Sequence, residues 1–336
     1  MTNKTTMLML TLCSLFLGIA DLQAQPESRI RPNKTVLLYP EGQNSGKGLP
    51  ETKGPGESNE ITGCEKTNSQ GFITMVSDSA RIDLYFPKKP NGQMIVVCPG
   101  GGYHFLSSHN EGIYVAEWML EKGISIAVVK YRLPNGHWEV PLTDVQNAFR
   151  YCRAHADEWN IRQIGIMGFS AGGHLAASAT TMYEDAVTRP DFSVLVYPVI
   201  TMERGITHNG TRDNLIGKDE KWNSREGKNI KEWEASKEMH GNLLKRYSLQ
   251  NNITPDTPPV FLVHCSDDKT VPVENSLLFY RNLIKNKVNT EMHIFPKGGH
   301  GWGFSSLKYV DSDNFNYCRK EFENSLTRWL EGIRNH

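Results

Sequence analysis

Residues 164–173 read IGIMGFSAGG, and this stretch decides the fold class of the chain. An apolar run of strand type leads directly into Gly168-Phe169-Ser170-Ala171-Gly172, and a segment rich in alanine and glycine follows. The GxSxG pattern alone is a weak signal, but small residues between a strand and a helix permit the tight turn of a nucleophile elbow. Such a turn holds the Ser170 hydroxyl above a helix N-terminus, which favours developing negative charge. We therefore predict a nucleophilic Ser170, with a plain strand–turn–helix and a buried serine as the alternative.

Short runs of strand type alternate with longer amphipathic segments over most of the chain. The strand-type runs lie at 80–86, 94–98, 124–130, 164–168, 193–197, 260–265 and 291–295. Segments with helical spacing lie at 114–122, 142–159, 172–183 and 273–286, and another closes the chain. Nearly unbroken Val, Ile and Leu indicate strands that are covered on both faces. The alternation predicts an α/β fold, a mostly parallel sheet with helices on both faces, within one domain.

The N-terminal part of the chain divides into two segments that precede this domain. Residues 1–24 have the pattern of a signal peptide, with Lys4 before an apolar run at 7–20 and a small residue, Ala24, at the expected cut. The apolar run is too short to span a membrane, so we expect a periplasmic or secreted protein with no integral membrane segment after cleavage. Residues 25–72 are rich in Gly, Pro, Ser and Asn and predict an extended arm.

The domain itself is expected to cover residues 73–336, with an insertion at about 203–257. That insertion is charged and polar, and it interrupts the alternation of strands and helices. We expect it to form a short helix or two near the functional face of the sheet. The stretches 103–113, 203–240 and 300–304, rich in His, Asn, Arg, Glu and Trp, are the expected walls of a pocket.

Composition excludes several classes of protein. The chain has 37 Lys+Arg and 37 Asp+Glu, and this zero net charge argues against a nucleic-acid partner. The 6 cysteines are scattered, without CxxC pairs, and one of them, Cys13, falls in the predicted signal peptide. This pattern predicts neither a disulfide framework nor a zinc site, although a single bridge stays open. Cys98 and Cys265 end apolar runs and are expected to pack as small hydrophobes. No metal or cofactor is expected.

Two loops near the C-terminus supply candidate partners for the serine. Residues 297–303 read KGGHGWG, and flexible glycines on either side would let the imidazole of His300 reach the serine as its base. Residues 266–272 read SDDKTVP after another strand-type run, so Asp267 and Asp268 compete for the role of orienting acid. Asp268 is favoured, with Asp267 as a turn-former or helper. His264 lies inside an apolar run and is expected to be a satisfied core residue. The chain order Ser, Asp, His is that of the α/β-hydrolase fold.

A glycine run offers donors for an oxyanion. Residues 99–103 read PGGGY at the end of the run 94–98. Consecutive glycines allow backbone N–H groups to point inward without obstruction. We expect the backbone N–H of Gly101 or Gly102, together with that of Ala171, to form an oxyanion hole. A phosphate cradle is the alternative, but the chain has no GxxxxGK[ST] pattern.

Several of these blocks together resemble one family. PGGGY with HNEG at 109–112, GFSAGGHLA, TPDTPPVFLVH, SDDKTVPVENSLLFY and FPKGGHGWG are similar to the secreted α/β-hydrolase esterases of carbohydrate-degrading bacteria. The resemblance is to the acetyl-xylan-esterase-like branch, related to hormone-sensitive-lipase and feruloyl-esterase enzymes. It implies removal of acetyl groups from plant polysaccharide or oligosaccharide, with Ser170 as nucleophile, Asp268 as acid, His300 as base and no metal. Pro99 stands where many relatives carry a histidine.

The substrate side is read from polar and aromatic residues near these motifs. An acetylated saccharide is the expected partner, and Tyr103, His104, Glu111 and Trp302 are its predicted contacts. Ordinary packing is the alternative for Trp302. His109 and Asn110 are expected either to contact sugar or to cap the helix that begins near Glu111. A feruloyl or other small-acyl esterase, a serine exopeptidase and a non-catalytic sugar-binding relative remain alternative functions, and the sequence does not indicate an oligomeric state.

Overall fold

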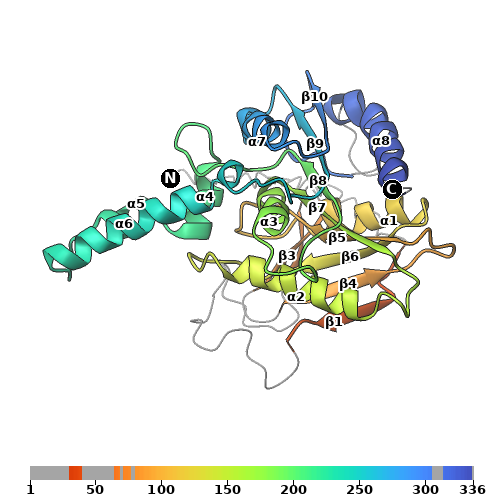
Figure 1. Ribbon diagram of the computed structural model, residues 1–336, viewed down its shortest axis with the longest axis horizontal. Helices are drawn as coiled ribbons and strands as arrows, with labels where there is room; N and C mark the ends of the chain where they lie inside the picture. The colour runs from red at the N-terminus through yellow and green to blue at the C-terminus, as the bar shows by residue number, and fades with distance from the viewer. Residues whose placement is uncertain (1–29, 40–63, 69–70, 77–79, 305–312, 335–336) are drawn as a thin grey trace, which may run out of the picture.

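Eight strands form the main sheet of the molecule (Figure 1). The computed structural model describes residues 30–39, 64–68, 71–76, 80–304 and 313–334, so the predicted signal peptide lies outside the described residues. The strand order is β1-β4-β6-β5-β7-β8-β9-β10. These strands are β1 (Lys34–Leu37), β4 (Arg81–Tyr85), β5 (Gln93–Cys98), β6 (Ser125–Lys130), β7 (Gln163–Phe169), β8 (Ser193–Val196), β9 (Val260–Cys265) and β10 (Thr290–Phe295). Two pairs, β1–β4 and β4–β6, are antiparallel, and the other five pairs are parallel. This pairing confirms the predicted mostly parallel sheet.

Helices cover both faces of this sheet. Side chains of α2, α3 and α7 join the core on one face, and side chains of α1 and α8 join the core on the other. The helices are α1 (Tyr114–Leu120), α2 (Val140–Ala154), α3 (Ser170–Thr181), α7 (Glu274–Lys285) and α8 (Asp313–Arg334), and a π-helical turn (His109–Ile113) precedes α1. Every helical segment predicted from spacing is therefore present, within a few residues of its expected bounds. The molecule has the α/β-hydrolase architecture.

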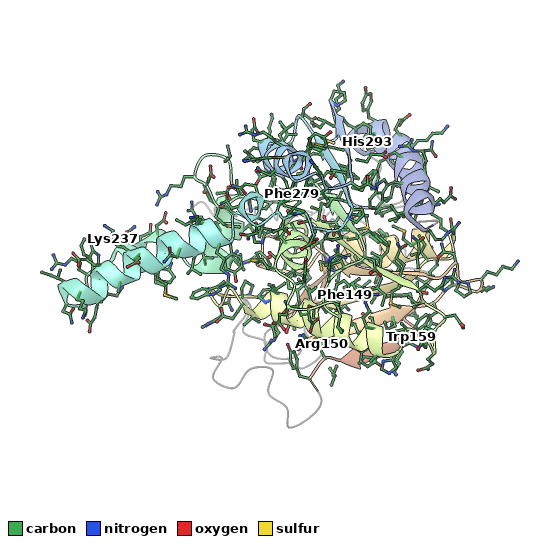
Figure 2. All side chains as sticks on the ribbon, in the orientation of Figure 1. Phe149, Arg150, Trp159, Lys237, Phe279 and His293 are labelled. Carbon is green, nitrogen blue, oxygen red and sulfur yellow. The ribbon has the colours of Figure 1, made fainter. Side chains whose placement is uncertain are left out.

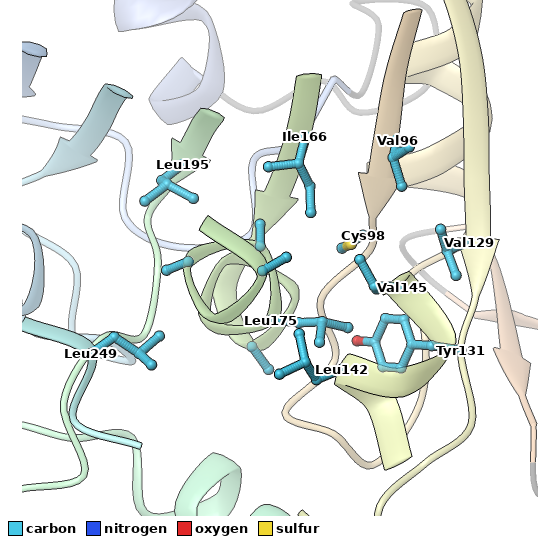
Figure 3. Close-up of a cluster of buried hydrophobic side chains, with 14 of the residues drawn as sticks. Val96, Cys98, Val129, Tyr131, Leu142, Val145, Ile166, Leu175, Leu195 and Leu249 are labelled. Carbon is cyan, nitrogen blue, oxygen red and sulfur yellow. The ribbon is translucent and has the colours of Figure 1, made fainter. Parts of the chain in front are cut away.

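Alternation along the central strands divides the core between the two faces. In β5, Met94 and Val96 pack with α2 and α3, whereas Ile95 and Val97 pack with α1 and α8. Figure 3 shows the first of these cores, where strand residues such as Val96 and Ile166 face the helices that carry Val145 and Leu175. A buried aliphatic side chain of this kind contributes about 1.5–3 kcal/mol to folding. Strands that are apolar on both faces are what the unbroken Val/Ile/Leu runs predict.

The strand order places a topological switch beside β5. The chain leaves β5 for β6 on one side and then crosses through α2 to β7 on the other side. Loops after β5 and β7 therefore diverge at the carboxyl edge of the sheet, which is where open α/β sheets bind ligands. Both the glycine run at 99–103 and Ser170 lie in these two loops.

The segment before residue 73 contributes to the sheet as well as preceding it. β1 extends the sheet by pairing with β4, with Thr35 opposite Asp83. A separate hairpin is formed by β2 (Cys64–Asn68) and β3 (Gly71–Met75), so the boundary expected at residue 72 falls inside a strand. The described parts of the predicted arm thus include an edge strand of the main sheet.

The insertion at 203–257 is more helical than the sequence suggested. It contains α4 (Asn209–Ile216), α5 (Asp219–Asn223), α6 (Ile230–Arg246) and a short 3₁₀ turn (Leu249–Asn251). α6 extends away from the body of the molecule, and its Lys237 points into solvent (Figures 1 and 2). Only two residues of its 17 are buried, so its apolar stripe was too short to predict a helix of that length. A capping box between Asn229 and Glu232 fixes its start instead.

Four cysteines are buried thiols: Cys98, Cys152, Cys265 and Cys318. Cys98 and Cys265 pack in the cores of the two faces, as predicted for small hydrophobes. Burial raises the pKa of the Cys152 thiol to about 12 and keeps it protonated. Within the described ranges, no helix combines the length and the apolar character needed to cross a membrane.

A buried ion pair joins the end of β6 to α2. Asp144 has no exposed side-chain surface, and it accepts hydrogen bonds from the Arg132 guanidinium at 2.6 Å and the Arg132 backbone N–H at 2.8 Å. The Tyr39 hydroxyl donates to the same carboxylate at 2.6 Å, which ties the N-terminal segment to the body. Such a pair specifies a geometry, because either charge left alone would be buried without compensation.

We predict that Asp144→Ala lowers the free energy of unfolding by about 3–5 kcal/mol, because it leaves the Arg132 guanidinium buried and unpaired. Arg150→Ala is the control, since Arg150, labelled in Figure 2, forms a surface ion pair with Glu184. Its cost is expected to stay below about 1 kcal/mol. Denaturant titration of both variants measures the difference. Equal costs would contradict the structural role assigned to Asp144.

Candidate active site

Ser170 lies at a sharp turn between β7 and α3. Its φ of 52° falls in the left-handed region, which is unfavourable for a residue with a side chain. Gly168 and Gly172, two positions before and after Ser170, must be glycines because other backbone atoms approach too closely for a Cβ. A Cβ on Gly168 would lie 2.1 Å from the carbonyl oxygen of Gly172, and one on Gly172 would lie 2.2 Å from that of Cys98. The turn therefore has the strained geometry expected of a nucleophile elbow.

His300 connects this serine to a carboxylate. Its Nε2 lies 2.8 Å from the Ser170 hydroxyl oxygen, and its Nδ1 lies 2.7 Å from an oxygen of Asp268. Asp268 follows β9 and His300 follows β10, two parallel neighbours whose carboxyl ends meet at the same edge of the sheet. A hydrogen-bonded chain from Asp268 through His300 to Ser170 is thus assembled from three separate loops.

The carboxylate of Asp268 is fully buried and saturated with donors. One of its oxygens accepts from the backbone N–H groups of Thr270 at 2.8 Å and Val271 at 2.9 Å. The other oxygen faces His300 and, at 3.2 Å, Nε2 of His264. Burial by itself raises the pKa of Asp268, but the hydrogen bonds from His264 and His300 outweigh it and hold the pKa well below its usual range. Asp268 is therefore a permanent anion beside the imidazole.

Asp267 has a different set of partners. Its carboxylate accepts hydrogen bonds from the backbone N–H groups of Gly299 at 2.8 Å and Gly298 at 3.3 Å. It therefore fastens the glycine loop that carries His300, without contacting the imidazole. Of the two candidate acids, the structure brings only Asp268 to the histidine.

His264 is a core residue, as expected, and it also reaches the candidate site. It has no exposed surface, and its Nδ1 and Nε2 lie 2.8 Å from the Ser276 hydroxyl and 2.9 Å from the Val271 carbonyl oxygen. Nε2 faces a carbonyl oxygen, so it carries the proton, and it shares that proton with Asp268. Nothing in the local sequence separates this arrangement from ordinary core packing.

The glycine run after β5 curls beside Ser170. Gly101 and Gly102 have φ of 127° and 63°, and a Cβ on Gly101 would lie 2.1 Å from the carbonyl oxygen of Phe105. Carbonyl oxygens of the turn accept from His104 and Ser107. In the part of the chain that the structure describes, no hydrogen bond uses the backbone N–H of Gly101 or Gly102. Ala171 stands in the first turn of α3, where N–H groups have no intrahelical acceptor. These three N–H groups are therefore free to meet an oxyanion.

A cavity of about 440 Å³ opens over Ser170 and His300. This volume lies within the range typical of small-molecule sites. Most of its lining comes from 101–111, 208–214 and 300–301, which overlap the stretches expected from the sequence, and Ser170 and Thr270 complete it. The lining residues are Gly101, Gly102, His104, Phe105, Ser107, Glu111, Ser170, His208, Gly210, Asn214, Thr270, His300 and Gly301.

Two of the predicted substrate contacts lie outside this cavity. Tyr103 is 1% exposed, and its hydroxyl lies 3.1 Å from Nδ1 of His174 in the core. Trp302 is 3% exposed and packs edge-on against Tyr197. The structure therefore does not support either residue as a substrate contact. The turn of the glycine run directs Tyr103 into the core, and Trp302 packs beneath the loop that carries His300. His104 and Glu111 do line the cavity, although the Glu111 carboxylate is bound by protein groups on both oxygens.

Sequence reasoning missed His208, which the insertion places in the cavity wall. His208 is the N-cap of α4, and its Nδ1 accepts the backbone N–H of Thr211 at 3.2 Å and faces the Thr211 hydroxyl at 2.8 Å. Because Nδ1 accepts from a backbone N–H, the proton of the neutral ring resides on Nε2. Burial lowers the pKa of His208, which favours the neutral ring. Only the richness of 203–240 in polar residues pointed toward this position.

The histidine and acidic residues around His109 are not arranged as a metal site. Among the residues that the structure describes, no group of three or more His, Cys, Asp or Glu side chains is arranged to hold a metal ion. His109 and Asn110 are buried: the His109 ring packs on Tyr114, and Asn110 donates to the Gly301 carbonyl oxygen at 2.8 Å. Asn110 therefore supports the loop that carries His300, and neither His109 nor Asn110 lines the cavity as a sugar contact.

Comparison with known proteins places this geometry among esterases. Residues 82–283, more than half of the chain, match the family model described as BD-FAE. The chain is 36% identical to an acetylxylan esterase of Xylanibacter ruminicola, over 78% of this chain and 50% of that protein. It is 32% identical to endo-1,4-beta-xylanase B of Butyrivibrio fibrisolvens, over 62% of this chain and 32% of that protein. The chain thus spans half or less of the length of these two relatives.

A solved structure agrees with the fold. The acetyl ester-xyloside bifunctional hydrolase from Caldicellulosiruptor lactoaceticus superposes with a TM-score of 0.64 at 31% identity, covering 91% of this chain and 98% of that one. The fold of this chain is therefore shared with a hydrolase of related sequence.

We predict that Gly172→Ala destabilises the fold by about 1–3 kcal/mol, because the added Cβ overlaps backbone carbonyls that cannot move alone. The shift should also slow labelling of Ser170 by a serine-reactive phosphonate. Gly241→Ala is the control, because a Cβ there meets nothing within 4 Å on exposed α6 and should stabilise by about 1 kcal/mol through helix propensity. Thermal unfolding and labelling rates test both variants; unchanged labelling in Gly172→Ala would contradict the tight elbow.

Proposed function

We propose that this chain, which belongs to the BD-FAE family, is a serine carboxylic-ester hydrolase that removes acetyl groups from plant polysaccharide or oligosaccharide of the xylan type. The observation that carries the proposal is the hydrogen-bonded chain from Asp268 through His300 to Ser170, which opens on a polar cavity. The similarity to an acetylxylan esterase and to an acetyl ester-xyloside hydrolase supports the substrate class.

The first step of the proposed reaction is attack of Ser170 on the acetyl carbonyl. The Nδ1–H group of His300 donates a hydrogen bond to anionic Asp268. Its Nε2 therefore carries no proton and faces the serine hydroxyl at 2.8 Å as the base. As the Oγ–C bond forms, Nε2 takes the hydroxyl proton and the carbonyl oxygen becomes an oxyanion. The buried carboxylate stabilises the imidazolium that results.

The oxyanion requires donors that are already in place. The N–H groups of Gly101, Gly102 and Ala171 are the proposed donors, because they lie on the two loops that flank Ser170. Preorganised donors of this kind are each worth about 10²–10³ in kcat. The sugar alcohol then leaves with the proton from His300, and water hydrolyses the acyl-enzyme by the same proton route.

The saccharide is proposed to lie against the polar wall of the cavity. His208 offers an Nε2–H donor there, and His104 and Asn214 contribute further polar groups. A neutral donor suits a sugar hydroxyl or ring oxygen, and the glycines leave room for a small acyl group. This polar lining supports a saccharide ester over a long-chain lipid ester.

We further propose a periplasmic or secreted location, on the basis of the signal-like residues 1–24 and the expected cut after Ala24. The proposed organisation is a signal peptide, an N-terminal segment whose strand β1 joins the main sheet, and a hydrolase domain that carries the insertion. An extracellular location is consistent with a polysaccharide substrate.

The proposal predicts acetate release from acetylated xylan, from its oligosaccharides and from 4-nitrophenyl acetate, and Ser170→Ala should abolish all three. Ser170→Ala removes the nucleophile while leaving a side chain that fits the turn. Acetate release is measured enzymatically with the folded state checked by circular dichroism. Turnover of the nitrophenyl ester alone would remove the xylan assignment and point to feruloyl or other small-acyl esters. Activity on peptides would indicate an exopeptidase, and failure of Ser170 to react with a phosphonate would indicate a non-catalytic sugar-binding protein.

The two adjacent aspartates give a matched pair of variants. Asp268→Asn should lower kcat by about 10⁴, since the neutral amide neither fixes the tautomer of His300 nor stabilises its cation. Asp267→Asn should cost far less, because its carboxylate binds only the N–H groups of the glycine loop. Steady-state kinetics on 4-nitrophenyl acetate compare them. A larger loss in Asp267→Asn would reverse the assignment of the acid.

A further inference from the structure

We propose that Glu111 is a positioning residue that does not contact the substrate. It fixes the relative position of two loops, the oxyanion loop (residues 99–103) and the base loop (residues 297–303). This inference rests on the proposed function of the same site. Glu111 is 3% exposed and borders the cavity, and its two carboxylate oxygens are bound by groups from two different loops. Glu111 is not one of the three residues proposed for catalysis, Ser170, Asp268 and His300.

One oxygen of Glu111 holds the oxyanion loop. Oε2 accepts the backbone N–H of Gly100 at 2.6 Å, a short hydrogen bond. Gly100 directly precedes Gly101 and Gly102, the proposed oxyanion donors, and a Cβ on Gly100 would lie 2.9 Å from Cβ of Ser170. The position of this peptide therefore sets where the next two N–H groups stand relative to the nucleophile.

The other oxygen holds the base loop through Tyr197. The Tyr197 hydroxyl lies 2.8 Å from Oε1 of Glu111, and it accepts the backbone N–H of Gly303 at 2.8 Å. Gly303 is three residues beyond His300, and the Tyr197 ring packs on the imidazole with 4.7 Å between centroids. A single carboxylate is thus linked to both parts of the machinery that act in the transition state.

The donors around Glu111 suit a carboxylate that accepts on both oxygens. Gly303 donates to the Tyr197 oxygen, so the Tyr197 proton is available to donate onward to the carboxylate. The Gly100 N–H donates to the other oxygen, so neither oxygen of Glu111 needs a proton of its own. The pKa of Glu111 is raised, because burial outweighs the opposing effect of the hydrogen bonds from Tyr197 and Gly100. An amide in its place would offer one acceptor instead of two and would break one of the links.

Tyr197 itself carries a second sign of constraint. Its φ is 36°, in the left-handed region that a residue with a side chain adopts at a cost. Such a conformation persists where surrounding contacts over-determine it. The hydroxyl bonds to Glu111 and Gly303, together with a backbone hydrogen bond from Tyr197 N–H to the Val263 carbonyl at 2.7 Å, supply those contacts.

The test compares Glu111→Gln, Tyr197→Phe and the double variant on 4-nitrophenyl acetate. Each single variant should lower kcat roughly 10- to 100-fold, less than outright deletion of an oxyanion donor, with KM changed less than about twofold, because the loops act on the transition state. The double variant should lose little more than either single one, since both break the same chain of hydrogen bonds. Concentrations of competent sites are fixed by end-point titration with a phosphonate.

Asp191→Asn is the matched control. Asp191 accepts the backbone N–H of Ile164 at 2.6 Å, the same length as the Glu111–Gly100 bond, but at the opposite end of β7 from Ser170. This variant should lower Tm and leave kcat per titrated site unchanged.

Three outcomes would overturn the inference while leaving the proposed function intact. A raised KM with unchanged kcat in Glu111→Gln would make Glu111 a substrate contact. A lowered Tm with unchanged kcat per site, as in the control, would make its role merely structural. Additive losses in the double variant would mean that Glu111 and Tyr197 act separately. An inactive wild-type protein would overturn the proposed function itself.

Discussion

The close approach of α3 to the carboxyl end of β5 is the constraint on which the rest of the site depends. Gly172 lies so near the carbonyl oxygens of Cys98 and Pro99 that a single added carbon would overlap them. This contact fixes the distance between two loops that the sheet order brings together at the topological switch. Ser170 and the glycine run can therefore face a common point without any flexible side chain between them. The strained φ of Ser170 is the conformational cost of that arrangement.

The remaining members of the site arrive from the other half of the sheet. β9 and β10 are parallel neighbours, so the loops that follow them lie side by side and bring Asp268 to His300. The loop that carries His300 and the glycine run after β5 are each held by a carboxylate that accepts backbone N–H groups. Asp267 binds Gly298 and Gly299 in the base loop, and Glu111 binds Gly100 in the oxyanion loop. Glycine loops gain reach at the expense of rigidity, and buried acceptors for their N–H groups restore the rigidity.

Local pattern predicted the framework well because its signals are short-range. Unbroken apolar runs specify strands covered on both faces, and the run of small residues around Ser170 specifies a tight turn wherever it occurs. The insertion was harder to predict: α6 buries only His240 and Leu243, so it lacks the stripe from which helices are recognised. Tyr103 and Trp302 were misjudged for a related reason. The local turn decides whether an aromatic residue beside a functional loop packs into the core or faces the cavity. The identity of the residue does not indicate which of the two occurs.

The sequence by itself determined the α/β class, the order of the strands along the chain and the small set of residues from which a Ser, His and Asp could be drawn. It did so because strands, helices and tight turns depend on neighbours within a few positions. Only the tertiary structure decided that Asp268 and not Asp267 faces the imidazole, that Glu111 is bound on both oxygens, and that His208 from the insertion enters the cavity wall. Those outcomes depend on contacts between residues 32 to 112 positions apart in the chain, and no local pattern encodes such contacts.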